Sequence, residues 1–270
     1  MADSIVPPPD EHLTTGWEPD LPADDTLVRR AVLVHAGWAL ELAQALGRPA
    51  RRTDLWAGAR IGDRGALTNP VVLLQPLRDA AAVLAEVDEV IPPPVPYFLL
   101  SPWPTPDLGE HGLALLGHPP LMVRLPAPGG VPEPDGVDVH EATDPGELAV
   151  AERVLVEGYP MPDLEPLRPG DLLHPGLLGG PTRVWVGYVD GEPASVAAAH
   201  VRPDALLVEY VAALPRARGR GAGAAVTWAA TLADPALPAV LVASDDGRPV
   251  YERMGYLAVE RWTAWLRPAG

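Results

Sequence analysis

Cysteine and lysine are both absent from this 270-residue sequence. Without cysteine, the chain has no disulfide scaffold, no thiolate metal site and no thiol nucleophile. All 20 basic residues are arginine, so a lysine Schiff base and a Walker-type phosphate loop, which requires lysine, are also excluded. Any chemistry of this protein therefore rests on other side chains.

Long apolar runs are missing as well. No uninterrupted apolar stretch approaches the roughly 18 residues that a membrane-spanning helix needs. The first 20 residues contain acids and prolines, whereas a signal peptide has a basic start followed by an apolar stretch. We therefore expect a cytoplasmic protein that does not bind membranes.

Positive charge is scarce, with 36 acidic residues against 20 arginines and a formal net charge of −16. Such a charge repels nucleic-acid phosphates and anionic lipids. Nucleic-acid binding through Arg216, Arg218 and Arg220 would have to overcome it, and we expect no nucleic-acid partner. None of the seven histidines has the His-x-x-x-His spacing of a metal site, so we also expect no metal.

Proline and glycine mark the domain organisation. The length allows one large domain or two modest ones, at roughly 150 residues each. A stretch of eleven residues, 126–136, holds four prolines and three glycines and is the best candidate boundary. We expect a flexible lead-in at 1–20, an N-terminal unit at 21–126, a linker at 127–136 and a C-terminal unit at 137–270.

Hydrophobic spacing predicts the elements of both units. The N-terminal unit should contain an amphipathic helix at 24–46 that ends at Gly47, short strands at 71–74 and 97–100, and a helical segment at 77–87. The C-terminal unit should contain strands at 137–141, 183–189, 194–201, 206–213, 239–243 and 256–266. Helices are expected at 145–157, with Asp144 as the N-cap, and at 248–254. A third helix should run from a glycine-rich turn after residue 213 to about residue 233. Asp190-Gly191 should form the hairpin turn between the strands at 183–189 and 194–201. This order predicts an α/β protein with a mixed, mostly antiparallel sheet.

Residues 206–227 place a strand, a glycine-rich turn and a helix start in succession. Such a turn presents several backbone N–H groups at the positive end of a helix, which suits phosphate. A Rossmann turn needs a third glycine where Val226 and Thr227 stand. An ordinary glycine-rich turn with solvated arginines is the alternative to a phosphate site.

The hexapeptide Arg218-Gly219-Arg220-Gly221-Ala222-Gly223 resembles the Arg/Gln-x-x-Gly-x-Gly/Ala turn of the GNAT superfamily of N-acetyltransferases. About 30 residues later, Ser244–Tyr256 resembles that superfamily's second signature. The resemblance covers roughly residues 137–267 and implies a GNAT fold with acetyl-coenzyme A as cosubstrate. The coenzyme-binding residues that it implies are Val211, Ala212, Ala213, Arg218, Gly219, Arg220, Gly221, Ala222, Gly223, Ala224 and Ser244.

The resemblance also implies catalytic roles. Tyr251 stands where the family often has the acid that protonates the departing thiolate, although it could instead be a packed tyrosine. Glu209, a carboxylate within an apolar strand, is the first candidate for the base, with a solvated or arginine-paired side chain as the alternative. His200 is the second candidate, unless it is simply a polar strand end. A water relay would make neither of them essential.

The N-terminal half has no phosphate turn and loosely resembles the degenerate first half of tandem GNAT proteins, with an unrelated α/β cap as the alternative. We expect direct acetyl transfer to a primary amine of a small molecule or peptide by a monomer or homodimer. The loop at 158–181 is the expected substrate wall, and eleven acidic residues against two arginines at 131–180 favour a cationic amine. The alternative is a non-catalytic acyl-CoA-binding or regulatory tandem GNAT protein.

Overall fold

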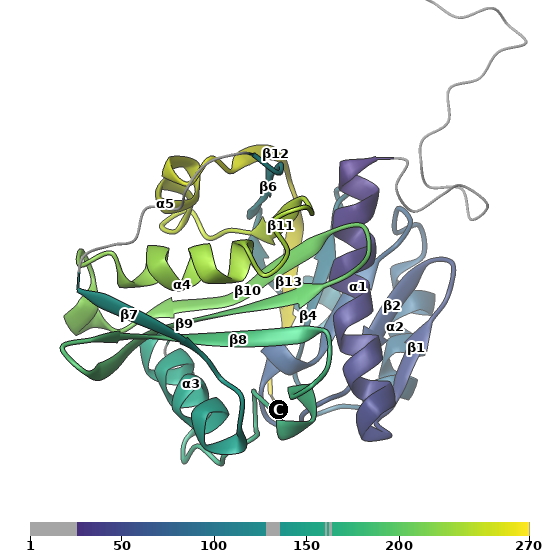
Figure 1. The fold of residues 1–270 in the computed structure, drawn as a ribbon. Coiled ribbons are helices and arrows are strands. Elements are labelled where there is room, and N and C mark those ends of the chain that lie inside the picture. The colour runs from purple at the N-terminus through teal and green to yellow at the C-terminus, as the bar shows by residue number, and fades with distance from the viewer. Residues whose placement is uncertain (1–25, 128–135, 160, 162–163, 270) are drawn as a thin grey trace, which may run out of the picture.

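The computed structural model describes residues 26–127, 136–159, 161 and 164–269. The predicted lead-in at 1–20 and most of the predicted linker lie outside these ranges. Two sheets, each with its own helices, make up the described part of the chain (Figure 1).

The first sheet has six strands in the order β1-β2-β3-β4-β13-β5. Its strands are β1 (Ala50–Arg52), β2 (Trp56–Ala59), β3 (Pro70–Leu73), β4 (Tyr97–Ser101), β5 (Ala114–Gly117) and β13 (Thr263–Arg267). The accompanying helices are α1 (Leu27–Leu46) and α2 (Ala80–Val90), with the short 3-10 turns η1 (Ala66–Thr68) and η2 (Gly109–His111).

The second sheet has seven strands in the order β12-β6-β11-β10-β9-β8-β7. Its strands are β6 (Pro120–Arg124), β7 (Val137–Glu141), β8 (Thr182–Val189), β9 (Glu192–Val201), β10 (Leu206–Ala213), β11 (Ala239–Val242) and β12 (Leu257–Arg261). The helices are α3 (Pro145–Gly158), α4 (Ala222–Thr231) and α5 (Arg248–Arg253), with the 3-10 turns η4 (Pro175–Leu177) and η5 (Pro215–Ala217).

Both sheets repeat one topology. In the first, β2 and β3 are antiparallel, and β3 and β4 are parallel and are joined through α2. In the second, β9 and β10 are antiparallel, and β10 and β11 are parallel and are joined through α4. In each sheet, the strand that lies next to this parallel pair belongs to the other half of the chain: β13 lies beside β4, and β6 lies beside β11. The N-terminal half is therefore a second copy of the same arrangement.

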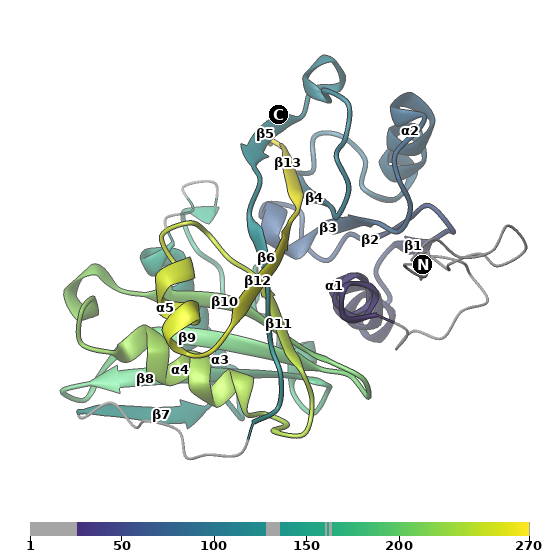
Figure 2. The ribbon, with the colours of Figure 1, turned by 90° about the horizontal axis from the view of Figure 1, so that it is seen from above.

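This exchange of strands corrects the sequence prediction at 256–266. The segment is not one strand: β12 pairs with β6 in the second sheet, and β13 pairs with β4 and β5 in the first. The chain changes sheet at Trp262, whose side chain is fully buried and whose amide donates to the Pro119 carbonyl at 2.9 Å. In return, β6 leaves the N-terminal half and lies between β11 and β12 (Figure 2). The division at 127–136 thus separates the halves in sequence, but not in their sheets.

Local signals set the ends of several elements as predicted. The Asp144 carboxylate caps α3 by accepting from the amides of Gly146 and Glu147. Gly47 ends α1 in the left-handed conformation, with φ of 63°. In the β8–β9 hairpin, Asp190 and Gly191 have φ of 55° and 80°, as a two-residue turn with positive φ at both positions requires.

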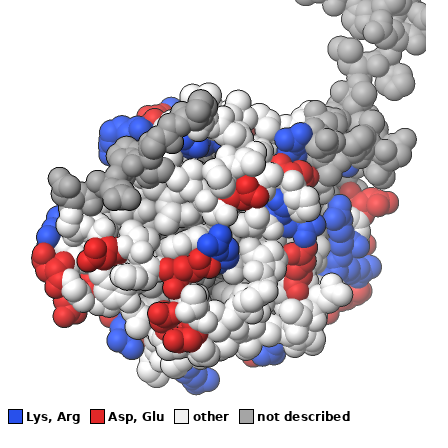
Figure 3. Space-filling model, viewed as in Figure 1, with Lys and Arg blue, Asp and Glu red and all other residues white. Residues whose placement is uncertain are grey.

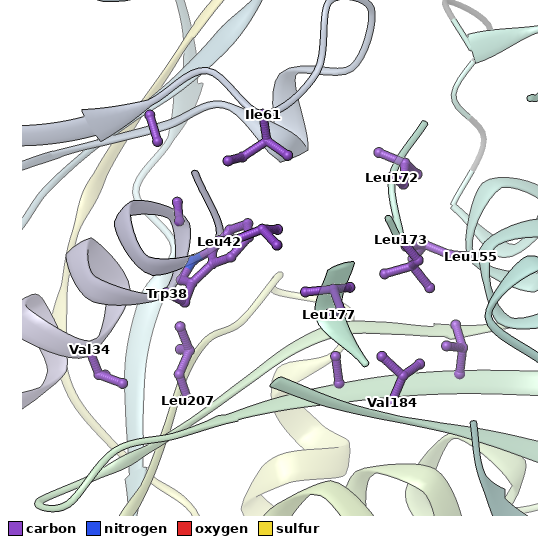
Figure 4. Close-up of a cluster of buried hydrophobic side chains, with 14 of the residues drawn as sticks. Val34, Trp38, Leu42, Ile61, Leu155, Leu172, Leu173, Leu177, Val184 and Leu207 are labelled. Carbon is purple, nitrogen blue, oxygen red and sulfur yellow. The ribbon is translucent and has the colours of Figure 1, made fainter. Parts of the chain in front are cut away.

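One continuous apolar cluster joins the two halves. Helix α1 contacts β2 and β3 of the first sheet as well as β10 of the second. Figure 4 shows Trp38 and Leu42 of α1 near Leu207 of β10 and Leu177 of η4. Helices α1 and α3 cover one face of the second sheet, whereas α4 packs with a separate cluster on the other face. The two halves therefore share a core.

Candidate functional site

The glycine-rich turn leads from β10 into α4 as predicted. Gly221 is the N-cap of α4, with φ of 80° in the left-handed region, and no side chain caps the helix. The first helical backbone bond runs from the Ala225 amide to the Gly221 carbonyl at 2.9 Å. The amides that precede Ala225 have no carbonyl one turn earlier to bond, so they point out of the helix end and are suited to bind an anion.

The arginines of this turn differ in their engagement. Arg220 forms a two-pronged ion pair with Asp190 of the hairpin, with N–O distances of 2.7 and 3.2 Å. This guanidinium lowers the pKa of the Asp190 carboxyl, mainly through the hydrogen bonds. Arg216 donates to the Pro193 carbonyl at 2.8 Å. Arg218 is exposed and forms no ion pair within the part of the chain that the structure describes, which leaves it available to an anion at the turn.

Next to the turn, the parallel strands β10 and β11 separate. They pair only through Leu206 with Ala239 and Leu207 with Val240. On its other side, β10 shifts register against β9 between Glu209 and Ala212, and Tyr210 has a φ of 55° in this bulge. Beyond the paired positions, the β11-facing edge of β10 has lost its partner strand. The predicted coenzyme contacts Val211, Ala212 and Ala213 lie in this segment.

Tyr251 lies on α5, within the cluster on the α4 face of the second sheet. Its ring meets that of Tyr256 edge-on, with 6.0 Å between ring centroids. Burial raises the pKa of the Tyr251 hydroxyl to about 12. The hydroxyl therefore keeps its proton at neutral pH and remains a hydrogen-bond donor.

Ser244, the other predicted contact in this region, lies just before α5. Its hydroxyl accepts from the Gly247 amide at 3.0 Å. Ser244 therefore shapes the turn into α5, while its hydroxyl proton remains available for donation.

Glu209 lies on the opposite face of the sheet from Tyr251. Its register partner is Ala198, and both share the face of Leu207, which α1 and α3 cover. Burial raises the pKa of the Glu209 carboxyl to about 8. A carboxylate with this pKa is a much stronger base than an ordinary glutamate, and its titration falls close to neutral pH.

His200 is on the same face as Glu209 but at the far end of β9. It is buried, and Nδ1 lies 2.9 Å from Thr182 Oγ1. Nε2 lies 3.5 Å from a carboxylate oxygen of Glu41 on α1, and Glu41 in turn pairs with Arg202. Burial lowers the pKa of His200 to about 4, so the ring is neutral at pH 7. Its packing against α1 makes it a weaker candidate for the base than Glu209.

Sequence reasoning missed the contribution that the N-terminal half makes next to Glu209. Tyr210, in the bulge, donates through its hydroxyl to the Leu67 carbonyl at 3.1 Å and meets Trp38 edge-on, with 5.9 Å between ring centroids. Leu67 belongs to η1 and Trp38 to α1. The residues around Leu67 and Trp38 in the sequence predict only a turn or a helix. They cannot predict the contacts with Tyr210, because these contacts join segments more than 100 residues apart.

The equivalent place in the N-terminal half is the segment that leads from β3 into α2. It contains no glycine, and the Asp79 carboxylate caps α2 by accepting from the Ala82 amide. A pocket of about 420 Å³ lies here between apolar side chains such as Leu73 and Val83. With a carboxylate at the helix end, this copy does not suit a phosphate.

Within the described ranges, no three His, Asp or Glu side chains come together in a way that would hold a metal ion. None of the helices in those ranges is both long and apolar enough to span a bilayer.

Comparison with known proteins gives matches at the level of structure. No protein-family model matches the sequence, and neither does any curated relative. A GCN5-related N-acetyltransferase from Kribbella flavida is similar, with 23% identity, a TM-score of 0.60 and coverage of 87% of this chain and 96% of that one.

Two further solved structures are similar over most of their length. A conserved protein of unknown function from Staphylococcus epidermidis has 13% identity, a TM-score of 0.59 and coverage of 83% of this chain and 94% of that one. A GCN5-related N-acetyltransferase-like protein from Streptococcus suis has 15% identity, a TM-score of 0.53 and coverage of 88% and 96%. At these identities the likeness is one of fold.

Proposed function

We propose that this chain, which has the fold of the GCN5-related N-acetyltransferases, transfers an acetyl group from acetyl-coenzyme A to a primary amine. One observation carries the proposal. The N-terminus of α4 has no side-chain cap, and it follows β10 through η5 and the glycine-rich turn, after the point where β10 has parted from β11. An anion and an extended chain can therefore bind side by side, and coenzyme A combines these two features.

The residues present fit the coenzyme. The amides around Gly221 and the exposed Arg218 would hold its phosphates. The unpaired edge of β10 at Val211–Ala213 offers backbone donors and acceptors to the amides of its arm, in the manner of an added strand. When bound, the coenzyme supplies an acetyl thioester, and the chain itself must position and deprotonate the amine.

Glu209 and Tyr251 suit the two proton transfers. Glu209 would accept the proton from the amine, directly or through a water, as the new C–N bond forms. Tyr251 would donate a hydrogen bond and then its proton to the sulfur as the C–S bond breaks. The two side chains lie on opposite faces of the second sheet, near the place where β10 and β11 stop pairing. This arrangement supports direct transfer from one side of the sheet to the other.

The acceptor in this proposal is a small-molecule or peptide amine, with a preference for cations. Between residues 131 and 180 the sequence has eleven acidic residues and two arginines. On the face shown in Figure 3, acidic and basic side chains are both scattered, with much uncharged surface between them. The proposed preference therefore rests on the acidic composition of residues 131–180, and not on an acidic patch of the face in Figure 3. In this proposal the protein binds neither nucleic acid nor membrane, and it acts as a monomer or homodimer.

A thiol-release assay with acetyl-coenzyme A tests the proposal. Diamines, aminoglycoside-like molecules, peptides with free amino termini and neutral amines would serve as acceptors. We expect thiol release that depends on the acceptor, with cationic acceptors favoured at low salt. Preference for neutral acceptors at low salt would refute the choice of substrate class.

A second candidate is a coenzyme-binding protein without transferase activity. It is favoured by the packing of α1 over the Glu209 face, where Trp38 and Tyr210 fill space next to the proposed base. Calorimetry would then show coenzyme binding, while no acceptor releases thiol. In that case Tyr251→Phe would leave every measured property of the coenzyme complex unchanged.

A further inference from the structure

The segment 164–177, here called the strap, crosses from α3 toward the N-terminal half. The sequence predicts a loop at 158–181 that forms a substrate wall, but it does not show what holds this loop in place. In the structure, buried and charged side chains hold the strap at two points, one in each half of the molecule.

The first point is Glu152 of α3. Its side chain is completely buried, and its carboxylate accepts from the amides of Gly170 at 2.8 Å, Leu172 at 2.6 Å and Leu173 at 3.1 Å. A buried carboxylate is costly unless donors surround it, and these three amides are such donors. Glu152 therefore fixes the backbone of the strap against α3.

The second point is Arg64, in the turn between β2 and η1 of the N-terminal half. Its guanidinium donates to the carbonyls of Glu165 at 3.0 Å and Pro166 at 3.1 Å and pairs with the Asp171 carboxylate at 3.0 Å. Arg64 retains about a quarter of its side-chain exposure, so solvent screens the charge only in part. One side chain of the N-terminal half thus holds three places on the strap.

The strap covers the face of the second sheet that carries Glu209. Leu172, Leu173 and Leu177 belong to the apolar cluster that also contains Leu207 of β10 (Figure 4). The strap also abuts the turn that carries Arg64, since a Cβ placed on Gly65 would lie 3.2 Å from Leu172 Cδ2. That turn runs into η1, where Leu67 accepts the hydrogen bond of Tyr210. The cover of this face of the sheet is therefore built from both halves.

From this geometry we propose that Arg64 and Glu152 are positioning residues that fix the strap as the acceptor-facing wall, so that the N-terminal half sets which amines are accepted. The inference rests on the proposed acetyl transfer. Neither residue touches the reacting atoms. Each acts through the backbone that it holds, and the N-terminal copy, whose own helix end is closed to phosphate by Asp79, has this role in place of coenzyme binding.

Arg64→Gln tests the inference, with Arg60→Gln as its matched control. Arg60 lies in the same turn, and among the residues that the structure describes its one ion pair is with the neighbouring Asp63, at 2.7 Å. For Arg64→Gln we expect the KM of the best acceptor to rise about tenfold and the ratio of kcat/KM between a small and a bulky amine to shift at least fivefold. The dissociation constant of coenzyme A should stay within twofold, and Arg60→Gln should change none of these values. Arg64→Lys should restore part of the selectivity, because one cation can still reach the strap.

Hydrogen exchange gives a readout that does not depend on activity. We expect the amides of residues 170–173 to exchange faster in Glu152→Gln and Arg64→Gln than in Arg60→Gln. Faster exchange with unchanged acceptor selectivity would overturn the inference, because the strap would then be structural only. So would unchanged exchange. Failure of the underlying function is a different result: the wild-type protein itself would bind coenzyme A and release no thiol with any amine.

Discussion

Asp79 and Gly221 occupy the same position in two copies of one topology. Each is the N-cap of the helix that joins two parallel strands, but the Asp79 carboxylate closes the end of α2, whereas Gly221 leaves the end of α4 uncapped. A carboxylate and a phosphate compete for the same amides. This difference assigns anion binding to the C-terminal copy.

Replacing Gly221 with aspartate should close the second helix end as well. Both Asp and Asn tolerate the left-handed backbone of this position, so Gly221→Asn is the matched control. Because only Asp adds a negative charge beside the phosphates, we expect coenzyme A to bind about 10- to 100-fold more weakly to Gly221→Asp than to Gly221→Asn. Isothermal titration calorimetry measures both. Equal affinities would mean that the phosphates do not sit at this helix end.

Tyr251→Phe removes the proposed proton donor and leaves the ring. The ring contact with Tyr256 should persist, so the fold and coenzyme affinity should stay nearly intact. We expect kcat to fall about 100-fold, in the usual range for the loss of a general acid. Steady-state kinetics alongside coenzyme titration separates the two effects. An unchanged kcat would show that the sulfur leaves without help from this hydroxyl.

Glu209 predicts a pH dependence of the rate. Because its pKa is raised to about 8, most of the carboxyl is protonated at pH 7 and becomes able to accept a proton as the pH increases. We expect kcat/KM to rise with pH up to an apparent pKa near 8 and Glu209→Gln to abolish this limb. A profile that keeps the same limb in Glu209→Gln would assign the titration to another group, such as the acceptor amine itself.

The same group predicts a pH dependence of stability. A pKa raised on folding means that the folded state binds the Glu209 proton more tightly than the unfolded state, whose pKa is near 4.5. The stabilisation is therefore complete below about pH 4.5 and is lost as the pH rises through 8. Glu209→Gln should have a higher Tm than the wild type at pH 8.5, and this advantage should shrink at pH 5. Calorimetric melts of both proteins at pH 8.5 and pH 5 measure this difference in Tm. A difference that is the same at both pH values would contradict the burial of the Glu209 carboxyl.

The exchanged strands predict that the C-terminal half does not fold alone. A fragment of residues 137–270 lacks β6, which separates β11 from β12, and its β13 has no sheet to join. We expect the fragment to show no cooperative unfolding by circular dichroism. As a control, a protease site inserted within 128–135 of the full chain should allow cleavage without separating the halves in size-exclusion chromatography. Two halves that part after cleavage would contradict the shared core.

Several elements followed from short stretches of sequence. Asp144 as the cap of α3, Gly47 as the end of α1 and the Asp190-Gly191 hairpin all depend on the conformational preferences of a few adjacent residues. The glycine-rich turn and its place between a strand and a helix were readable for the same reason. Strands β1, β2, β5 and β6 were not among the predicted elements. Strand β1 has only three residues, none of them buried, so hydrophobic spacing does not mark it.

The sequence by itself determined the local conformation of this protein and the chemistry available to it: no thiol, no lysine, and a strand, glycine turn and helix in the order that anion binding requires. Only the tertiary structure decided which segments meet. The change of sheet at Trp262, the cover that α1 provides over Glu209 and the hold of Arg64 on the strap join residues far apart in the chain. Such contacts are set by the packing of the whole core, and no window of neighbouring residues encodes them.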